Sequence, residues 1–207
     1  MNVVERAKSV CVSPDSTWAA IVSERSEAVP LIIGYVLPLA GAAAVAQVIG
    51  LSLVGQNLGL LGTYRVPLTT GLGMAVASLV FAAVGVVVLS IVIDALAPTF
   101  GAERSREQAL KLAVYSATPV WVAGVLQVIP VLGVVVLLGS LYALYLLYLG
   151  LPRLMKCPAD KTPGYLGSVI VSAIVIGLVG SLVIGRIGRV EATTMAPVFD
   201  PSVYSER

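Results

Sequence analysis

Few side chains in this chain are of types that could carry out acid–base, nucleophilic or metal chemistry. The 207 residues include no histidine, which excludes an ordinary Ser–His or Cys–His nucleophile pair and a histidine metal ligand. The two cysteines, Cys11 and Cys157, lie far apart in the sequence and form no C-x-x-C motif. We therefore expect no catalytic residue, no metal site and no cofactor, and an enzyme is the least favoured hypothesis.

Two ionisable residues in or beside long apolar stretches are the first functional candidates. Asp94 lies near the end of one stretch and Lys111 at the start of the next. An ionisable group in hydrocarbon is costly, so it marks a functional site by default. The two side chains could pair at one depth, or each could extend separately to the lipid headgroups. With the residues that follow Lys111 they form a candidate polar or gate cluster: Asp94, Lys111, Tyr115, Ser116, Thr118 and Pro119.

The composition places these residues in a membrane. Hydrophobic residues make up 58% of the chain and charged residues only 12%, and the mean hydropathy is +0.98. A soluble domain has about 25% charged residues. The sequence therefore predicts an integral membrane protein, with membrane lipids as partners. The net charge of +2, without a basic stripe, argues against a nucleic-acid partner.

Five apolar stretches are long enough to cross a bilayer, which takes about 20 residues per helix. They cover about residues 31–54, 72–96, 110–129, 132–149 and 165–185. The predicted fold class is an all-α polytopic membrane protein, in which residues 30–186 form a bundle of five transmembrane helices. The break at Pro130 and Val131 is so short that spans three and four must form an antiparallel hairpin. We expect residues 187–207 to be a polar, flexible tail.

The first 29 residues contain no apolar run of the kind found in a signal peptide. Helical spacing predicts two short amphipathic helices here, the second with Ser13 as N-cap and Pro14 at its first position. Trp18, Ile21 and Val22 share one face of this second helix. We expect both helices on the cytoplasmic membrane surface, and a partly disordered tail is the alternative.

The basic residues indicate an orientation, because basic loops remain in the cytoplasm. Nine of the thirteen Lys and Arg residues lie on the side of the N-terminus and of the loops after spans two and four. We expect a cytoplasmic N-terminus and an outside C-terminus, although Arg186 and Arg189 oppose this assignment. Cys157, in the loop after span four, is then a reduced thiol near the membrane surface or a site of S-palmitoylation.

Pro119 interrupts the third span. It has no N–H and its ring clashes with the carbonyl group of Tyr115, which predicts a kink. In lipid the freed carbonyl group needs a partner, which the hydroxyl groups of Ser116 and Thr118 or neighbouring helices can supply. We therefore expect this cluster to lie inside the bundle.

Span four carries three tyrosines within about a third of the helix circumference. They form either a helix interface that reaches the headgroup region or an aromatic groove for lipid or a partner: Tyr142, Tyr145 and Tyr148.

Small residues recur every four positions in span five and allow close helix association in lipid. This candidate helix–helix interface serves packing within the chain, a homo-oligomer or another membrane-protein partner: Ala173, Gly177, Ser181 and Gly185.

Spans one and three share a weak similarity. At one constant offset, Tyr35 matches Tyr115 and Gln47 matches Gln127. A parallel internal repeat and chance agreement between two apolar segments both account for these matches.

The segment from residue 100 to 161 resembles the bacterial branch of the Yip family, the Ypt/Rab-interacting membrane proteins, and the similarity extends over about residues 12–185. The N-terminal Pro14, Trp18 and Glu24 fit the family's Pro…Trp…Glu start. The resemblance implies five spans, a cytosolic N-terminus and a bacterial cytoplasmic membrane. The other matching residues are Phe100-Gly101, Ala109-Leu110-Lys111, Tyr115-Ser116, Thr118-Pro119, Leu144-Tyr145, Tyr148-Leu149-Gly150 and the segment 152–156.

Eukaryotic members of this family act in vesicle traffic and bind prenylated Rab GTPases and one another. This chain lacks their long cytosolic N-terminal domain and their Asp-Leu-Tyr-Gly-Pro segment, so a Rab-type GTPase is not an expected partner. Our hypothesis is a non-enzymatic membrane protein that organises membrane or recruits partners through helix–helix assembly. The alternative is a small transporter or lipid-binding channel, with Asp94, Lys111, Tyr115 and Pro119 around its cytoplasmic mouth. A hydrated cavity lined by Asp94, Tyr115 and the three tyrosines of span four would favour this alternative.

Overall fold

The computed structural model describes residues 2–57 and 63–194, with side chains for residues 2–56 and 64–186. Five helical segments in this part of the chain are long and apolar enough to cross a membrane, which confirms the all-α polytopic bundle. Each begins or ends beyond the predicted bounds, and they are Ala28–Val54, Leu68–Phe100, Arg106–Val128, Pro130–Leu154 and Thr162–Arg186.

The first span is built from several helical pieces. A π-helical turn at Ile32–Val36 comes directly before Leu37 and Pro38, where the missing N–H of Pro38 interrupts the α-helical ladder. The pieces in chain order are α3 (Ala28–Leu31), the π-turn, α4 (Leu37–Val48) and a second π-helical stretch (Ile49–Val54). After this span a short antiparallel pair, β1 (Gln56–Asn57) and β2 (Thr63–Tyr64), leads to the second span.

The other spans are longer α-helices. Helix α5 ends in a 3₁₀ turn, and two more 3₁₀ turns around Ile129 join α6 to α7 as the expected tight hairpin. Their bounds are α5 (Leu68–Leu96), α6 (Arg106–Gly124), α7 (Val134–Leu154) and α8 (Thr162–Thr194). Residues 187–194 therefore belong to α8, and residues 195–207 lie outside the described part of the chain.

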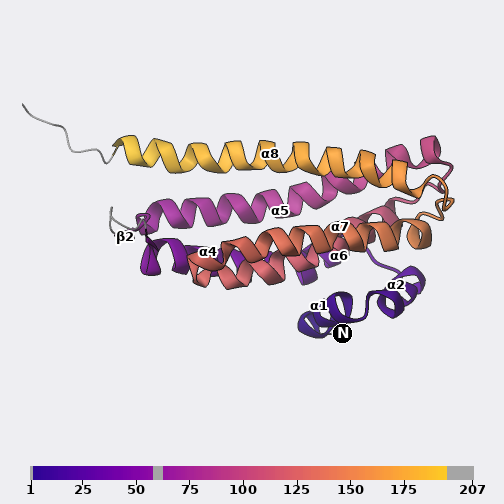
Figure 1. The fold of residues 1–207 in the computed structure, drawn as a ribbon, viewed down its shortest axis with the longest axis horizontal. Coiled ribbons are helices and arrows are strands. Elements are labelled where there is room, and N and C mark those ends of the chain that lie inside the picture. The colour runs from indigo at the N-terminus through magenta and orange to yellow at the C-terminus, as the bar shows by residue number, and fades with distance from the viewer. Residues whose placement is uncertain (1, 58–62, 195–207) are drawn as a thin grey trace, which may run out of the picture.

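Helix α6 is the centre of the bundle. In its most apolar window 72% of the residues are buried, against 11–28% in the other four spans. Helices α4, α5 and α7 pack against α6, and α8 packs against α5 and α7 (Figure 1). The outer helices expose many Val, Leu and Ile side chains, as a protein does when lipid is its solvent. The interruptions of span three by polar residues and Pro119 thus coincide with the protein interior.

Small residues set the distance between helices at two places. A Cβ added to Gly139 of α7 would lie 2.7 Å from the carbonyl oxygen of Pro119 in α6. A Cβ added to Gly180 of α8 would overlap the ring of Phe81 in α5. Nearer the start of α8, the Tyr165 hydroxyl donates to the Ile93 carbonyl of α5. These contacts fix α7 on α6 and α8 on α5.

Two short helices, α1 (Val3–Val12) and α2 (Pro14–Ser23), precede the bundle and lie beside it (Figure 1). We call residues 3–23 the N-terminal cap. The buried residues of its apolar faces, Ala7, Val10, Trp18 and Ile21, pack against α6 and α7. Protein therefore covers these four residues, which were expected to contact the membrane surface, while the placement of the segment at that surface stays a prediction.

Two details of the cap also differ from expectation. Ser13 is the N-cap residue of α2, as predicted, but its side chain makes no capping hydrogen bond, and its carbonyl oxygen accepts one from Thr17 Oγ1 at 2.7 Å. Val22 is 36% exposed and does not continue the face formed by Trp18 and Ile21. Pro14 does occupy the first turn of α2, as predicted.

Candidate functional site

The end of the bundle that carries the cap also carries most of the basic side chains. The cap residue Asp15 pairs with Arg153 at the end of α7, and Glu103 before α6 pairs with Lys156 after α7. These contacts place at one end the N-terminal segment and the connections after the second and fourth spans. We call it the basic end.

Lys111, in α6, is completely buried at this end. Its Nζ atom donates to the carbonyl oxygens of Ile21 at 3.0 Å and Glu24 at 2.6 Å, and lies 3.3 Å from Glu107 Oε1. Ile21 and Glu24 belong to the C-terminal end of α2, where carbonyl groups lack helical partners and a positive charge is favourable. Lys111 therefore neutralises this helix end while satisfying its own three donors.

Asp94 does not pair with Lys111. Its Oδ2 atom accepts from Arg104 Nη2 at 3.0 Å, and its Oδ1 atom has no hydrogen-bond partner in the described part of the chain. The side chain is only 7% exposed. Both sequence alternatives for the two residues, a mutual pair or separate extension to the headgroups, are therefore wrong. Gly101, in the left-handed region with φ of 67°, helps turn the chain so that Arg104 returns to Asp94.

Tyr115 lies at the centre of an aromatic and polar cluster beneath the cap. Its ring centroid is 4.9 Å from that of Tyr35 and 6.5 Å from that of Trp18, with edge-to-face geometry in both pairs. The guanidinium group of Arg6 lies 5.7 Å from the centroid of the Tyr115 ring and forms two hydrogen bonds to Glu24, at 2.5 and 2.6 Å. The cluster thus joins α1, α2, the first span and α6.

The hydroxyl groups near Pro119 do not have the partner that the sequence suggested. Thr118 Oγ1 lies 2.9 Å from the hydroxyl oxygen of Tyr35, and Ser116 Oγ has no partner among the described residues. Neither bonds to the carbonyl group of Tyr115. All four residues from Tyr115 to Pro119 that were singled out are buried, as expected for a cluster inside the bundle.

The three tyrosines of α7 separate into two environments. The Tyr142 hydroxyl donates to the carbonyl oxygen of Cys11 in the cap at 2.8 Å. Tyr145 and Tyr148 are 47% and 46% exposed, although the Tyr145 ring centroid lies 5.6 Å from that of Tyr142. Only Tyr142 therefore belongs to the packed site.

The small-residue row of α8 makes little contact with the rest of the chain. A Cβ added to Gly177 or Gly185 would meet nothing within 4 Å, and Ser181 is exposed and bonds only within its own helix, to Leu178. Ala173 is partly buried. The close contact of α8 is made instead by Gly180, from the neighbouring row.

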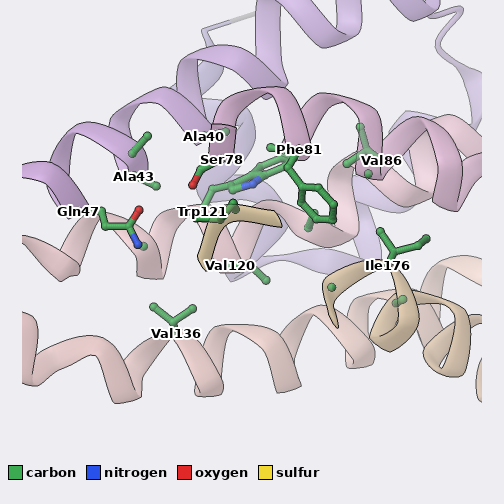
Figure 2. A pocket seen from close by; sticks show the side chains of 18 of the residues that line it. Ala40, Ala43, Gln47, Ser78, Phe81, Val86, Val120, Trp121, Val136 and Ile176 are labelled. Carbon is green, nitrogen blue, oxygen red and sulfur yellow. The ribbon is translucent and has the colours of Figure 1, made fainter. Parts of the chain in front are cut away.

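A cavity of about 420 Å³ lies between helices α4 to α8 (Figure 2). Its wall contains many alanine and glycine residues, which leave space where larger side chains would pack. We call it the intramembrane cavity. Its polar side chains are Gln47, Ser78 and Gln127, and its other lining residues include Ala43, Phe81, Gly85, Ala117, Val120, Trp121, Val136, Ala173, Ile176 and Gly177.

The predicted polar mouth is not open. Lys111, Tyr115 and Thr118 are buried beneath the cap, and Tyr115 and the α7 tyrosines line neither the intramembrane cavity nor a second cavity beside Asp94. The arrangement therefore gives no support to a transport path through this cluster.

Sequence reasoning missed several residues that complete the site. Arg6, Glu24 and Glu107 contribute charges, and Trp18 and Tyr35 contribute rings. The sequence did contain two indications: Tyr35 matched Tyr115 in the weak repeat, and Trp18 and Glu24 belonged to the family-like start. The other contacts involve backbone carbonyl groups, which leave no side-chain pattern.

Comparisons with known proteins agree with this architecture. Residues 8–181 match the Yip1 domain. The inner membrane protein YohC of Escherichia coli K12 is 26% identical over 145 residues, which cover 69% of this chain and 74% of that protein, and YohC of E. coli O6:H1 gives the same values. No solved structure matches. The chain is therefore an integral membrane protein that belongs to the Yip1 domain family.

Proposed function

We propose that this chain is a non-enzymatic protein of the bacterial inner membrane, which organises the bilayer by holding membrane lipid in its intramembrane cavity. The inner-membrane location follows the name of the E. coli relative. The basic end then faces the cytoplasm, because basic segments remain on that side. The observation that carries the proposal is an apolar cavity formed between helices that cross the bilayer.

The dimensions of the cavity suit a lipid chain. Its lining residues on α5 run from Ser78 to Leu89, a distance of about 16 Å at 1.5 Å per residue. This is about half of the roughly 30 Å hydrocarbon thickness. A cavity at this depth is surrounded by lipid. An acyl chain matches its apolar lining and is abundant around it, so we take an acyl chain as the occupant.

Two carboxamide groups give the cavity a polar part. Gln47 and Gln127 line it, and neither side chain has a hydrogen-bond partner among the described residues. Unbonded amide groups in hydrocarbon are costly. Hydroxyl and ester oxygens of a glycerolipid would supply their partners. This combination favours a lipid over a pure hydrocarbon.

The test is lipid retention by the purified protein. Native mass spectrometry of the full chain, extracted in a mild detergent, should show retained lipid. Gly177→Leu places a side chain from an open position into the cavity, and we expect at least a fivefold decrease in the lipid-bound fraction. Gly167→Leu is the matched control, because Gly167 lies on the same helix, meets open space and lines no described cavity. Equal retention by both variants, or none by the unmodified protein, would overturn the proposal.

A second candidate function is recruitment of another transmembrane helix, in a second copy or in a different membrane protein. The supporting observation is the open row of Gly177, Ser181 and Gly185 on α8. Small residues of this kind permit close helix approach in lipid. A Ser181→Cys variant without Cys11 and Cys157 should form a disulfide-linked dimer in membranes. The absence of this product, with no other cross-linked species, would count against assembly through this face.

A further inference from the structure

A second cavity, of about 510 Å³, lies at the basic end and on a different face of α5 from the intramembrane cavity. It is formed by the start of the first span, the last turns of α5 and the first turn of α6. We call it the basic-end cavity. Its lining residues are Ser26, Ala28, Val87, Ser90, Ile91, Asp94, Ala95, Arg104, Arg106, Glu107 and Leu110.

The lining divides into an apolar part and a charged part. Val87, Ile91 and Leu110 provide apolar surface, and the Ile91 side chain is 61% exposed. At the end of the helices the lining carries two guanidinium groups and two carboxylates, so the opposite charges balance. This arrangement of apolar surface below charged groups matches the boundary between acyl chains and headgroups.

The charged groups retain unused binding capacity. Arg106 is exposed and forms no ion pair with any described residue, so its guanidinium group is available to a phosphate. Asp94 Oδ2 accepts from Arg104, whereas Oδ1 has no partner among the described residues. Only 7% of the Asp94 side chain is exposed. A buried carboxylate oxygen without a donor is unfavourable, and an N–H donor would relieve it.

We infer that the basic-end cavity binds a phospholipid whose headgroup joins a phosphate to a primary ammonium group. Arg106 and Arg104 bind the phosphate, Asp94 and Glu107 accept from the ammonium group, and the acyl chains follow Val87, Ile91 and Leu110. This site goes beyond the proposed function, because it selects a headgroup on another face of α5.

The charged residues of the basic-end cavity also predict which headgroups bind less tightly. A phosphoglycerol headgroup carries no ammonium group, so it lacks the Coulomb attraction that an ammonium group gains beside the carboxylates of Asp94 and Glu107. A choline headgroup has no N–H to donate to the carboxylates, and the cavity has no aromatic side chain to receive a quaternary ammonium group. The predicted order is therefore phosphatidylethanolamine above phosphatidylcholine and phosphatidylglycerol.

The experiment measures lipid selection by the full chain in nanodiscs that contain the three lipids with identical acyl chains. Native mass spectrometry after release from the disc gives the bound lipid composition. We expect at least fivefold enrichment of phosphatidylethanolamine over the other two. Arg106→Gln should weaken binding of all three about tenfold, whereas Asp94→Asn should remove the preference for ethanolamine over choline. Lys156→Gln is the control, since it removes a positive charge at the same end but outside the cavity.

Asp94→Asn breaks the pair with Arg104, so this variant could lose the preference through misfolding alone. A second variant is therefore included. Ala95→Trp fills the cavity from an exposed position, and it should abolish the preference without removing a buried contact. Preferential binding of phosphatidylglycerol, or an unchanged preference in both variants, would overturn the inference. Gly177→Leu should leave the headgroup preference intact, which separates failure here from failure of the proposed function.

Discussion

The Nζ atom of Lys111 lies 2.6 Å from the carbonyl oxygen of Glu24, although 87 positions separate the two residues in the chain. Lys111 belongs to the central helix α6, and Glu24 is the C-cap residue of α2, directly after the N-terminal cap. This contact makes an ammonium group, buried at the end of a membrane span, the attachment point of a segment outside the spans. The first prediction follows from it.

Replacement of Lys111 by methionine should detach the cap. Hydrogen bonds from charged groups contribute about 1.5–3 kcal/mol each. Because Lys111 makes two to backbone carbonyl groups, we expect the cap to lose about 3 kcal/mol or more of its docking free energy. Hydrogen–deuterium exchange of residues 3–23 should become at least tenfold faster. The exposed Lys161→Met is the control and should leave this exchange unchanged; equal effects of both variants would contradict the assigned role.

The Arg6–Glu24 pair should show measurable energetic coupling. The Arg6 side chain is 11% exposed and both Glu24 oxygens accept from it, so solvent screens this pair less than a surface pair. A double-mutant cycle with Arg6→Gln and Glu24→Gln should give about 1–2 kcal/mol, measured by thermal unfolding in detergent. The exposed pair of Glu103 and Lys156 should give less than about 0.5 kcal/mol. Similar values for both pairs would show that burial of Arg6 has no energetic effect.

Replacement by alanine should have different effects on stability at Gly180 and Gly177 of α8. Gly180→Ala forces a Cβ into the ring of Phe81, and we expect a loss of about 1–3 kcal/mol through overpacking. Gly177→Ala places the same group in open space and should not decrease stability. The melting temperatures of the two variants in one detergent test this. A neutral Gly180→Ala would show that α8 moves away from α5 without cost.

The three tyrosines of α7 should differ in their dependence on the hydroxyl group. Tyr142→Phe removes the hydrogen bond to Cys11 and leaves a carbonyl group without its donor, so we expect a loss of about 1 kcal/mol. The exposed residues Tyr145 and Tyr148 should tolerate the same change within about 0.5 kcal/mol. Equal losses of stability at all three positions would contradict the assigned role of the single hydrogen bond from Tyr142 to the cap and would favour a continuous aromatic groove.

The two thiols should react slowly with maleimide, for different reasons. Cys157 is 5% exposed, so the folded protein should protect it. Burial raises the pKa of the Cys11 thiol above its ordinary value, and the thiolate is the reactive form. Cys11 in a Cys157→Ser variant should therefore react more slowly than free cysteine at neutral pH, and its rate should rise with pH until the pH passes the raised pKa. Rapid labelling of Cys157 would mean that its segment opens and that S-palmitoylation is accessible to it.

Length and hydropathy were sufficient to predict the five spans, because crossing a bilayer imposes one strong requirement on every segment. The interior position of α6 could also be inferred, since Pro119 and its hydroxyl neighbours need protein around them. The docking of the N-terminal cap on the bundle could not be inferred from the sequence. Trp18 and Ile21 form an apolar face that fits a membrane surface and a helical bundle equally well, and only the tertiary structure distinguishes the two.

The charges near the basic end show a second limit. A plausible partner for Asp94 was Lys111, the cation at the same depth, but a left-handed turn at Gly101 brings Arg104 to it first. Lys111 then finds backbone carbonyl groups of a segment far away in the sequence. Backbone acceptors occur at every residue, so side-chain types and spacing carry no information about which ones a buried lysine will use.

The cap also imposes an order on biosynthesis. Its residues leave the ribosome before the spans, but Tyr142 and Arg153, which hold it, lie 131 and 138 positions from their partners Cys11 and Asp15. Residues 3–23 must therefore wait, with Trp18 and Ile21 uncovered, until the fourth span has been made and inserted. During that interval a chaperone or the membrane surface has to shield this apolar face, so a segment made before the spans is among the last to reach its final position.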